Sequence, residues 1–144
     1  MRHLKNTCKL GKTTPHRRCM FANMLKSIIT HGSIETTVQK AKVLRRYADR
    51  MITLAKENTL AARRRAISEL MIRYNPLTEK EKRAARGGDI SAYNDDRQVI
   101  SQLFDVLGPH FEGRQGGYTR IVRLNRRKGD NAETCLIEYV AEKL

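Results

Sequence analysis

The sequence has no tryptophan, and none of its apolar runs approaches the roughly 18 residues that a membrane-spanning helix needs. We therefore expect a soluble protein without a membrane partner. Its three cysteines, at positions 8, 19 and 135, include no closely spaced pair, and an odd count without a secretory signal favours reduced thiols in a cytoplasm. Aromatic residues make up only 6% of the 144 residues, so we expect a modest core in a single domain.

Acidic residues are absent from the first 34 positions, which carry seven Lys or Arg. A second basic segment, residues 114–131, has six basic residues against Asp130 alone, and the whole chain carries a net charge of +14. Such self-repulsion is tolerated where a polyanion neutralises it, and two separate basic segments suggest a two-part footprint on one nucleic acid. An anionic membrane surface is the weaker alternative, because the cations are not confined to one amphipathic helix.

Recognisable catalytic motifs are also absent: there is no nucleophile motif, no phosphate-binding loop and no visible acid–base pair. We therefore expect no catalytic site, no cofactor and no small-molecule substrate. His3, Cys8, His16 and Cys19 are zinc-ligand types, but their gaps of five, eight and three residues do not give the two close pairs of a usual zinc site. We expect no metal there, with Cys19 packed in the fold and Cys8 incidental.

The opening stretch MRHLKNTCKLGKTTPHRR has three interpretations, namely part of a zinc site, a targeting peptide or a basic arm. Transit peptides are Arg- and Ser-rich amphipathic helices, whereas this stretch has Gly11, no Ser and few aliphatic residues. We interpret residues 1–14 as an extended basic arm that follows phosphates, ahead of a domain over residues 15–144. The candidate RNA-binding residues in this part of the chain are Arg2, His3, Lys5, Lys9, Lys12, His16, Arg17 and Arg18.

Apolar periodicity and turn residues predict the element order α-β-α-α-α-β-β. Thr14-Pro15 begins the first helix and Gly32 ends it. The later elements are a strand at 33–38, helices at 37–56 and 59–71, a helix from Asn94 or Asp95 to Gly108-Pro109, and strands at 118–124 and 135–140. We therefore expect an α+β domain whose helices pack on a small mixed three-stranded sheet.

Residues 72–93 change character, because they combine Asn75-Pro76, a charge run and Gly87-Gly88. We interpret this segment as a surface excursion with a helical turn around residues 78–86. The polar face of the second helix, which includes Arg45, Arg46 and Asp49, is expected to be a solvated surface.

The second basic segment is a candidate RNA contact for two reasons. Gly116-Gly117 would let backbone N–H groups approach a phosphate, and Tyr118 either stacks on a base or packs against the fourth helix. The run from Arg126 to Lys128 lies at the predicted hairpin tip, where a cationic finger suits a groove, although a solvated turn is the alternative. The candidate residues here are Arg114, Gln115, Gly116, Gly117, Tyr118, Arg120, Arg123, Arg126, Arg127 and Lys128.

Several short runs occur in an order that is typical of one family. They are Met1–His3, His16-Arg17, Met20–Met24, Thr36-Thr37, Lys40–Arg45, Ile52–Lys56, Leu103–Phe104, Leu107–Pro109, Gly116–Ile121 and Gly129–Ala132. Because of these runs, the sequence resembles the bacterial large-subunit ribosomal protein number seventeen family over nearly its whole length. The relatives connect the third and fourth helices by a shorter segment, so the resemblance carries nothing over to residues 72–93.

The resemblance implies a structural protein of the bacterial ribosome that binds large-subunit ribosomal RNA and has no catalysis of its own. It also implies neighbouring ribosomal proteins near the peptide-exit region. The family's basic arm and Gly-Gly-Tyr-Thr-Arg segment match residues 1–18 and 114–123. A non-specific DNA-binding nucleoid protein is the main alternative, because the charge alone does not distinguish RNA from DNA.

Overall fold

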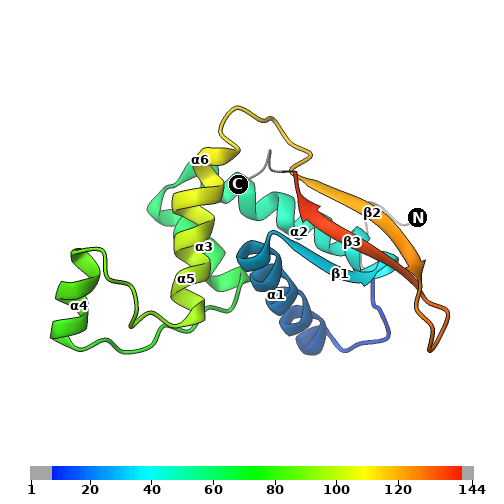
Figure 1. The fold of residues 1–144 in the computed structure, drawn as a ribbon, viewed down its shortest axis with the longest axis horizontal. Coiled ribbons are helices and arrows are strands. Elements are labelled where there is room, and N and C mark those ends of the chain that lie inside the picture. Colours follow the sequence, from blue (N-terminus) through cyan, green and yellow to red (C-terminus); the bar gives the residue numbers. More distant parts are fainter. Residues whose placement is uncertain (1–7, 141–144) are drawn as a thin grey trace.

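The structure, a computed structural model, describes residues 8–140 and has an α+β architecture, as predicted (Figure 1). Helices and strands follow one another in nearly the expected order. The elements are α1 (Thr14–His31), β1 (Ser33–Thr37), α2 (Val38–Glu57), α3 (Leu60–Glu69), α4 (Glu79–Arg86), α5 (Asp95–Ser101), the π-helical η1 (Gln102–Leu107), α6 (Gly108–His110), β2 (Thr119–Arg126) and β3 (Glu133–Tyr139). None of the helices within residues 8–140 is long and apolar enough to span a membrane.

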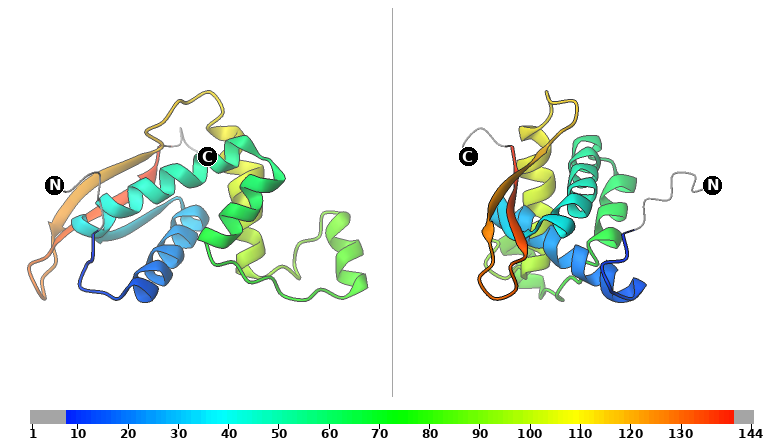
Figure 2. Two further views of the ribbon diagram at one scale, coloured as in Figure 1. Left: turned by 180° about the vertical axis from the view of Figure 1, so that it is seen from behind. Right: turned by 90° about the vertical axis from the view of Figure 1, so that its right-hand side faces the viewer.

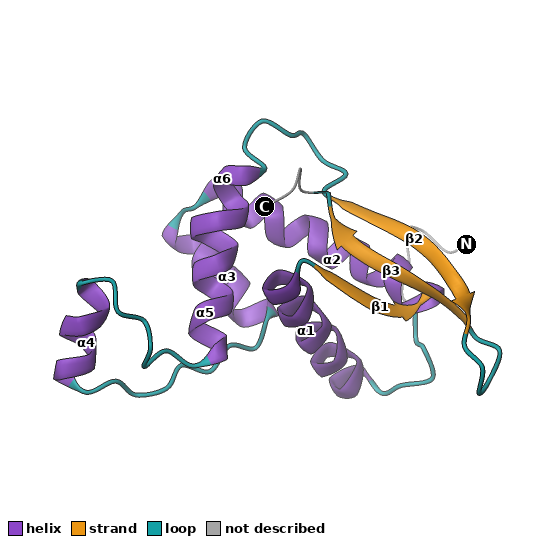
Figure 3. Ribbon diagram, in the orientation of Figure 1, coloured by secondary structure: helices purple, strands orange, loops and turns teal. Residues whose placement is uncertain are grey.

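The sheet has the order β1-β3-β2 and is antiparallel at both pairings (Figure 3). The predicted mixed sheet is therefore wrong. Strands β2 and β3 form a hairpin and are therefore antiparallel. Strand β1 pairs with the other edge of β3 and is also antiparallel to it, with Ser33 opposite Glu138. The last strand thus takes the central position, where both of its edges are hydrogen-bonded.

Helices α1 and α2 cover one face of the sheet (Figure 2). Alternate residues of β3, which are Cys135, Ile137 and Tyr139, point into this helical layer and are buried. On β2, Val122 and Leu124 remain about two-fifths exposed, because they lie on the uncovered face. The sequence showed Arg120 on the same face as these apolar residues, and the open face explains that pattern.

Helix α2 is the centre of the core. Its buried stripe repeats at helical spacing and meets the sheet, α1, α3, η1 and α6. The residues of this stripe are Val38, Ala41, Leu44, Ala48, Met51, Ile52, Leu54 and Ala55. Three of them, at positions 41, 48 and 55, are alanines, which let neighbouring elements approach the helix closely.

The sequence predicted that the long helix before β2 ends at Gly108-Pro109, but the helix continues through these two residues. It begins at Asn94, whose side chain accepts a hydrogen bond from the Arg97 N–H, and continues through η1 and α6 to His110. The Gly108 N–H donates to the Leu103 carbonyl, five residues earlier. This wider π turn accommodates Pro109, whose ring conflicts with the carbonyl four residues before it in a regular α-helix.

Segment 72–93 connects α3 to α5 and contains α4. Figure 1 shows α4 projecting at the far end of the molecule from the β2–β3 hairpin. The base of the excursion is fixed by Asp96, which accepts hydrogen bonds from Lys26 Nζ at 2.6 Å and from the Arg73 N–H at 2.6 Å. Asn94 donates to the Arg73 carbonyl at 2.7 Å. One carboxylate therefore joins α1, α5 and the excursion.

Replacing Gly108 by alanine tests the contact between α6 and α2. An added Cβ would lie 3.0 Å from the carbonyl oxygen and 3.3 Å from the carbonyl carbon of buried Ala55, so α6 or the α2 backbone would have to shift. We expect Gly108→Ala to lower the free energy of unfolding by about 1–2 kcal/mol, since overpacking exceeds the helix preference of alanine. Urea denaturation measures it. Gly113→Ala, which meets nothing within 4 Å, is the control, and equal stabilities would contradict the close contact.

Asp96 should also make stability depend on pH. Burial raises the pKa of its carboxyl, but hydrogen bonds from Lys26 and Arg73 outweigh burial, so the pKa lies below its usual value. Because the folded-state pKa is lowered, the stabilisation is present above the ordinary Asp range and disappears as the pH falls through the folded-state pKa. We expect Asp96→Asn to cost about 1–3 kcal/mol at pH 7 and progressively less in acid, as measured by urea denaturation from pH 7 to pH 2.

Asp95→Asn is the matched control for this experiment, because Asp95 is the exposed neighbour in the same first turn of α5. Its loss removes the same charge from the same helix end, without the two hydrogen bonds. A pH-independent difference between wild type and Asp96→Asn would show that Asp96 does not act through its charge.

Candidate nucleic-acid interface

The described part of the arm folds back onto the start of α1. The Lys12 N–H donates to the Lys9 carbonyl, with Leu10 and Gly11 at positive φ, and Arg17 donates to the Lys12 carbonyl at 3.3 Å. Lys9, His16 and Arg18 are exposed. Among the described residues, no carboxylate forms an ion pair with the basic side chains at positions 9, 12, 16, 17 and 18. Arg2, His3 and Lys5 lie outside the described residues.

A hollow of about 350 Å³ separates the arm from α2, and we call it the arginine groove. It is lined by Cys8, Arg17, Phe21, Val43, Arg46, Tyr47 and Arg50. Three arginines thus converge from two helices. Tyr47 is 40% exposed, and its ring packs against that of Phe21 with the centroids 5.4 Å apart. Guanidinium groups beside an exposed aromatic face suit phosphates and unpaired bases.

Sequence reasoning missed the contribution of α2 to this groove, because it treated the polar face of that helix as solvated. The available signal was the spacing of Arg46, Tyr47 and Arg50, which places two arginines one turn apart with an aromatic residue beside them. What the spacing did not reveal is that α1 brings Arg17 opposite. Arg50 also contacts Glu69 at 3.3 Å, so one of the guanidiniums is partly neutralised.

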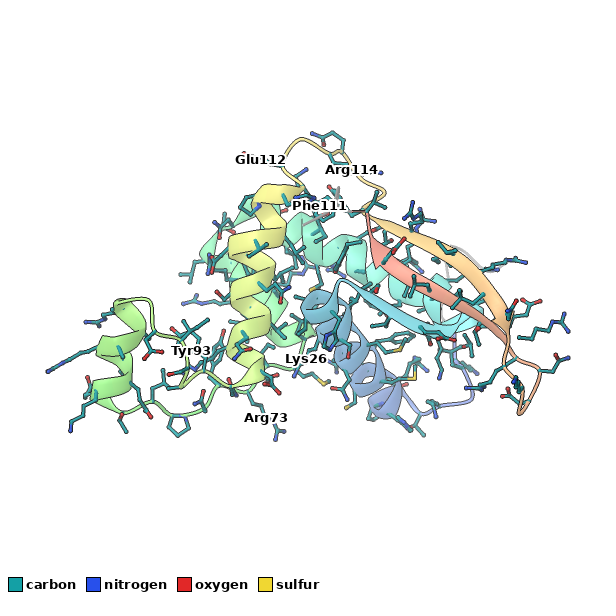
Figure 4. The ribbon with its side chains drawn as sticks, in the orientation of Figure 1. Lys26, Arg73, Tyr93, Phe111, Glu112 and Arg114 are labelled. Carbon is teal, nitrogen blue, oxygen red and sulfur yellow. The ribbon has the colours of Figure 1, made fainter. Side chains whose placement is uncertain are left out.

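Tyr118 belongs to the core. Its side chain is 6% exposed, and its ring packs edge-on against Phe111 with the centroids 5.3 Å apart. Lys56 Nζ donates to the Tyr118 hydroxyl at 3.4 Å and to the Arg114 carbonyl at 2.8 Å. The ring therefore has no free face for a base, and of the two alternatives in the sequence the packing one holds. Figure 4 shows Phe111 and Arg114 beside the loop that leads to β2.

The loop before Tyr118 keeps an accessible backbone. Gly116 and Gly117 have φ values of +109° and +60°, and an added Cβ at either position would point into open space. Arg114 is exposed and donates through Nε to the Gly116 carbonyl at 3.2 Å, which ties the loop together. Gln115 is also exposed. Glycine is favoured at both positions because of the positive φ. Crowding is not the reason, because no neighbouring atom lies close to the position of an added Cβ.

The hairpin tip presents fewer unpaired cations than its sequence suggested. Arg127 donates to both carboxylate oxygens of Asp130, at 2.9 Å and 2.6 Å, and this hydrogen-bonded pairing lowers the pKa of Asp130 to about 2. Arg126 lies 3.8 Å from Glu133. Lys128 is exposed and makes no ion pair with a described residue. The pairing of Arg127 therefore shapes the turn, and Lys128 is the cation that the tip offers without a carboxylate partner.

Strand β2 also carries one arginine with a carboxylate partner and one without. Arg120 pairs with Glu138 at 2.6 Å across the strands, whereas Arg123 is exposed and has no ion pair within residues 8–140. The described end of the arm and the hairpin lie at the same end of the molecule, opposite α4 (Figures 1 and 2). The second basic segment extends along β2 from the loop beside α6 to the hairpin tip, and its charges are unequally compensated (Figure 1).

The cysteines and histidines form no site in the described part of the chain. No group of three or more His, Cys, Asp or Glu residues there is placed to hold a metal ion. Cys8, Cys19 and Cys135 are free thiols. The sequence suggested that Cys19 packs in the interior, and this prediction is wrong. Cys19 is exposed on α1, with its Sγ 3.9 Å from Met71 Sδ.

Comparison with known proteins identifies relatives over almost the full chain. The family model for ribosomal protein L17 matches residues 20–140. The large ribosomal subunit protein bL17 of Protochlamydia amoebophila is 71% identical over 142 residues, which cover 99% of this chain and 100% of the relative. The bL17 proteins of Chlamydia abortus and Chlamydia muridarum are 60% and 58% identical, with at least 98% of each chain covered.

These relatives match the chain almost from end to end. Since the family model spans most of the chain and the identities are high over full lengths, the chain belongs to the ribosomal protein L17 family.

Proposed function

We propose that this protein is a structural constituent of the large ribosomal subunit, that it binds large-subunit ribosomal RNA in the cytoplasm, and that it supports translation without catalysing a reaction. The observation that carries the proposal is the end-to-end match to relatives named large ribosomal subunit protein bL17. The net charge of +14 supports it, because a polyanionic partner would neutralise this charge.

The arm and the arginine groove form the first RNA contact. Lys9, Lys12 and Arg18 have no carboxylate partner in the described part of the chain, so their charges are available to phosphates. Tyr47 offers a partly exposed ring between arginines, and an unpaired base stacks there. Arg2, His3 and Lys5 extend the same contact along the RNA. Binding here would neutralise the acid-free part of the sequence.

The Gly-Gly loop and the hairpin form the second contact. The open backbone at Gly116 and Gly117 lets a phosphate approach, and Arg123 and Lys128 supply uncompensated charge. Arg120, Arg126 and Arg127 contribute more weakly, because each already faces a carboxylate. Recognition through such contacts depends on RNA shape more than on base sequence. Neighbouring ribosomal proteins near the peptide-exit region complete the proposed surroundings.

A sucrose gradient of cell lysate at about 0.5 M salt tests the proposal, since this salt weakens exposed phosphate contacts strongly. Each fraction is probed for the protein. Migration with the large subunit through the wash is the expected result. Release to the top of the gradient, or retention on DNA after the ribosomes are removed, would favour the alternative of a non-specific DNA-binding nucleoid protein.

Tyr47 provides a sharper test of the groove. We expect Tyr47→Ala to weaken binding to purified large-subunit ribosomal RNA by about 1–3 kcal/mol, a factor of roughly 5 to 150, because a stacking face is lost. Filter binding at fixed salt measures the affinity. Tyr47→Phe keeps the stacking face and the Phe21 contact, and should bind like wild type. If the alanine variant folds and binds normally, no base stacks in the groove.

A further inference from the structure

Helix α4 contributes nothing to the core. None of its eight residues is buried, and it projects away from the layer formed by the sheet, α1 and α2 (Figures 1 and 2). A short helix without buried contacts is marginal by itself, because helix nucleation is costly. The helix nevertheless has a well-defined conformation, which local devices maintain.

The first device is a complete capping box. The Thr78 hydroxyl accepts from the Glu81 N–H at 3.4 Å, and the Glu81 carboxylate accepts from the Thr78 N–H at 2.7 Å. Glu79 forms an ion pair with Lys82 at 2.6 Å. Both carboxylates of the helix are therefore used within it, at the end where negative charge is favourable.

The second device holds the base of the excursion, which consists of residues 73–75 and 93–97. The Arg97 guanidinium lies between two aromatic rings, 4.6 Å from the centroid of Tyr74 and 5.5 Å from that of Tyr93. It also donates to the Asn75 side-chain oxygen at 3.0 Å and to the Asn75 carbonyl at 2.9 Å. The two chain segments that lead to and from α4 are thereby fastened together.

These contacts leave the outer cations of α4 unpaired. Lys80, Arg83 and Arg86 are exposed, and none forms an ion pair with an acidic residue in the described part of the chain. Of the three, Arg86 also lines a hollow of about 290 Å³, together with Leu77, Lys82, Ala85, Tyr93 and Arg97. Arg73 adds a further exposed cation that points away from the body of the protein (Figure 4). The excursion therefore presents exposed, unpaired cations, of which Arg86 lies beside an aromatic wall formed by Tyr93.

We propose that α4 and the base of the excursion form a second RNA-binding surface, in which Lys80, Arg83 and Arg86 contact backbone phosphates of large-subunit ribosomal RNA. The inference rests on the proposed function for the identity of the polyanion. Guanidinium groups match the geometry of phosphate oxygens, and a preformed helix loses little entropy on binding. Together with the arm and hairpin, this surface would attach the protein to RNA at both of its ends.

The experiment compares four full-length proteins, wild type and three variants, in binding to purified large-subunit ribosomal RNA over a range of salt. Arg83→Ala/Arg86→Ala removes two cations of α4 and keeps its capping box. Arg64→Ala is the control, because Arg64 is an exposed arginine of α3 that forms no ion pair within residues 8–140. In each case the slope of log affinity against log salt counts the phosphates contacted.

We expect the α4 variant to reduce the steepness of this slope by about 1.4 to 1.8, at roughly 0.7–0.9 per lost contact, and the α3 control to leave it unchanged. Arg83→Lys/Arg86→Lys, which keeps the charge, should recover most of the slope. Circular dichroism verifies that the variants are folded.

Two results would overturn the inference and leave the proposed function intact. In one, wild type binds the RNA and the α4 variant has the same salt slope. In the other, the α4 variant binds RNA normally but is washed from large subunits by salt, which would assign α4 to an acidic protein neighbour. If wild type itself does not prefer this RNA to duplex DNA, the proposed function fails first.

Discussion

The packing of α2 is the constraint on which the rest of the structure depends. Its buried side meets the sheet, α1, α3 and the η1–α6 helix, and the alanines at positions 41, 48 and 55 set how closely they approach. The opposite side of the same helix carries Arg46, Tyr47 and Arg50. Since a helix cannot rotate without moving both faces, the packed core determines where the arginine groove lies. The fold thus fixes the candidate interface by a rigid element instead of a flexible loop.

Carboxylate partners are distributed unequally over the basic residues. On β2 and at the hairpin tip, Arg120, Arg126 and Arg127 each face a carboxylate. Near the start of α1 the described cations have no such partner, and the sequence provides no acid in the first 34 residues. Exposed ion pairs contribute little to stability, so the paired arginines mainly hold local geometry. The uncompensated cations are the ones that a polyanion would neutralise with the largest gain.

The sequence predicted local features well and tertiary ones poorly. Helical periodicity, the stop at Gly32 and the turn between the last strands were confirmed, because neighbouring residues determine them. The helix through Pro109 was missed, since a π turn and the contact with Ala55 compensate for a residue that usually ends helices. The predicted mixed sheet was also wrong, because the sense in which β1 pairs with β3 depends on contacts about a hundred residues apart along the chain.

The same distinction between local and tertiary features explains which parts of the candidate site the sequence indicated. The sequence identified the basic arm and hairpin by composition alone, and neither inference required the fold. It did not decide whether Tyr118 stacks on a base or packs, because that depends on where Phe111 lies. It also missed Tyr47, whose exposure follows from the way α1 leans on α2.

Rigidity between the two ends of the molecule matters for any attachment to RNA. Asp96 joins α1 to α5 and to the base of the excursion, and α1 carries the end of the arm. The separation between the arm and the base of the excursion is therefore set by packed helices and hydrogen bonds. When two contacts lie on one rigid body, the first contact presents the second at a high effective concentration, provided that the RNA has the matching spacing. An RNA with another spacing would gain from only one end, so the fold itself would select RNA by shape.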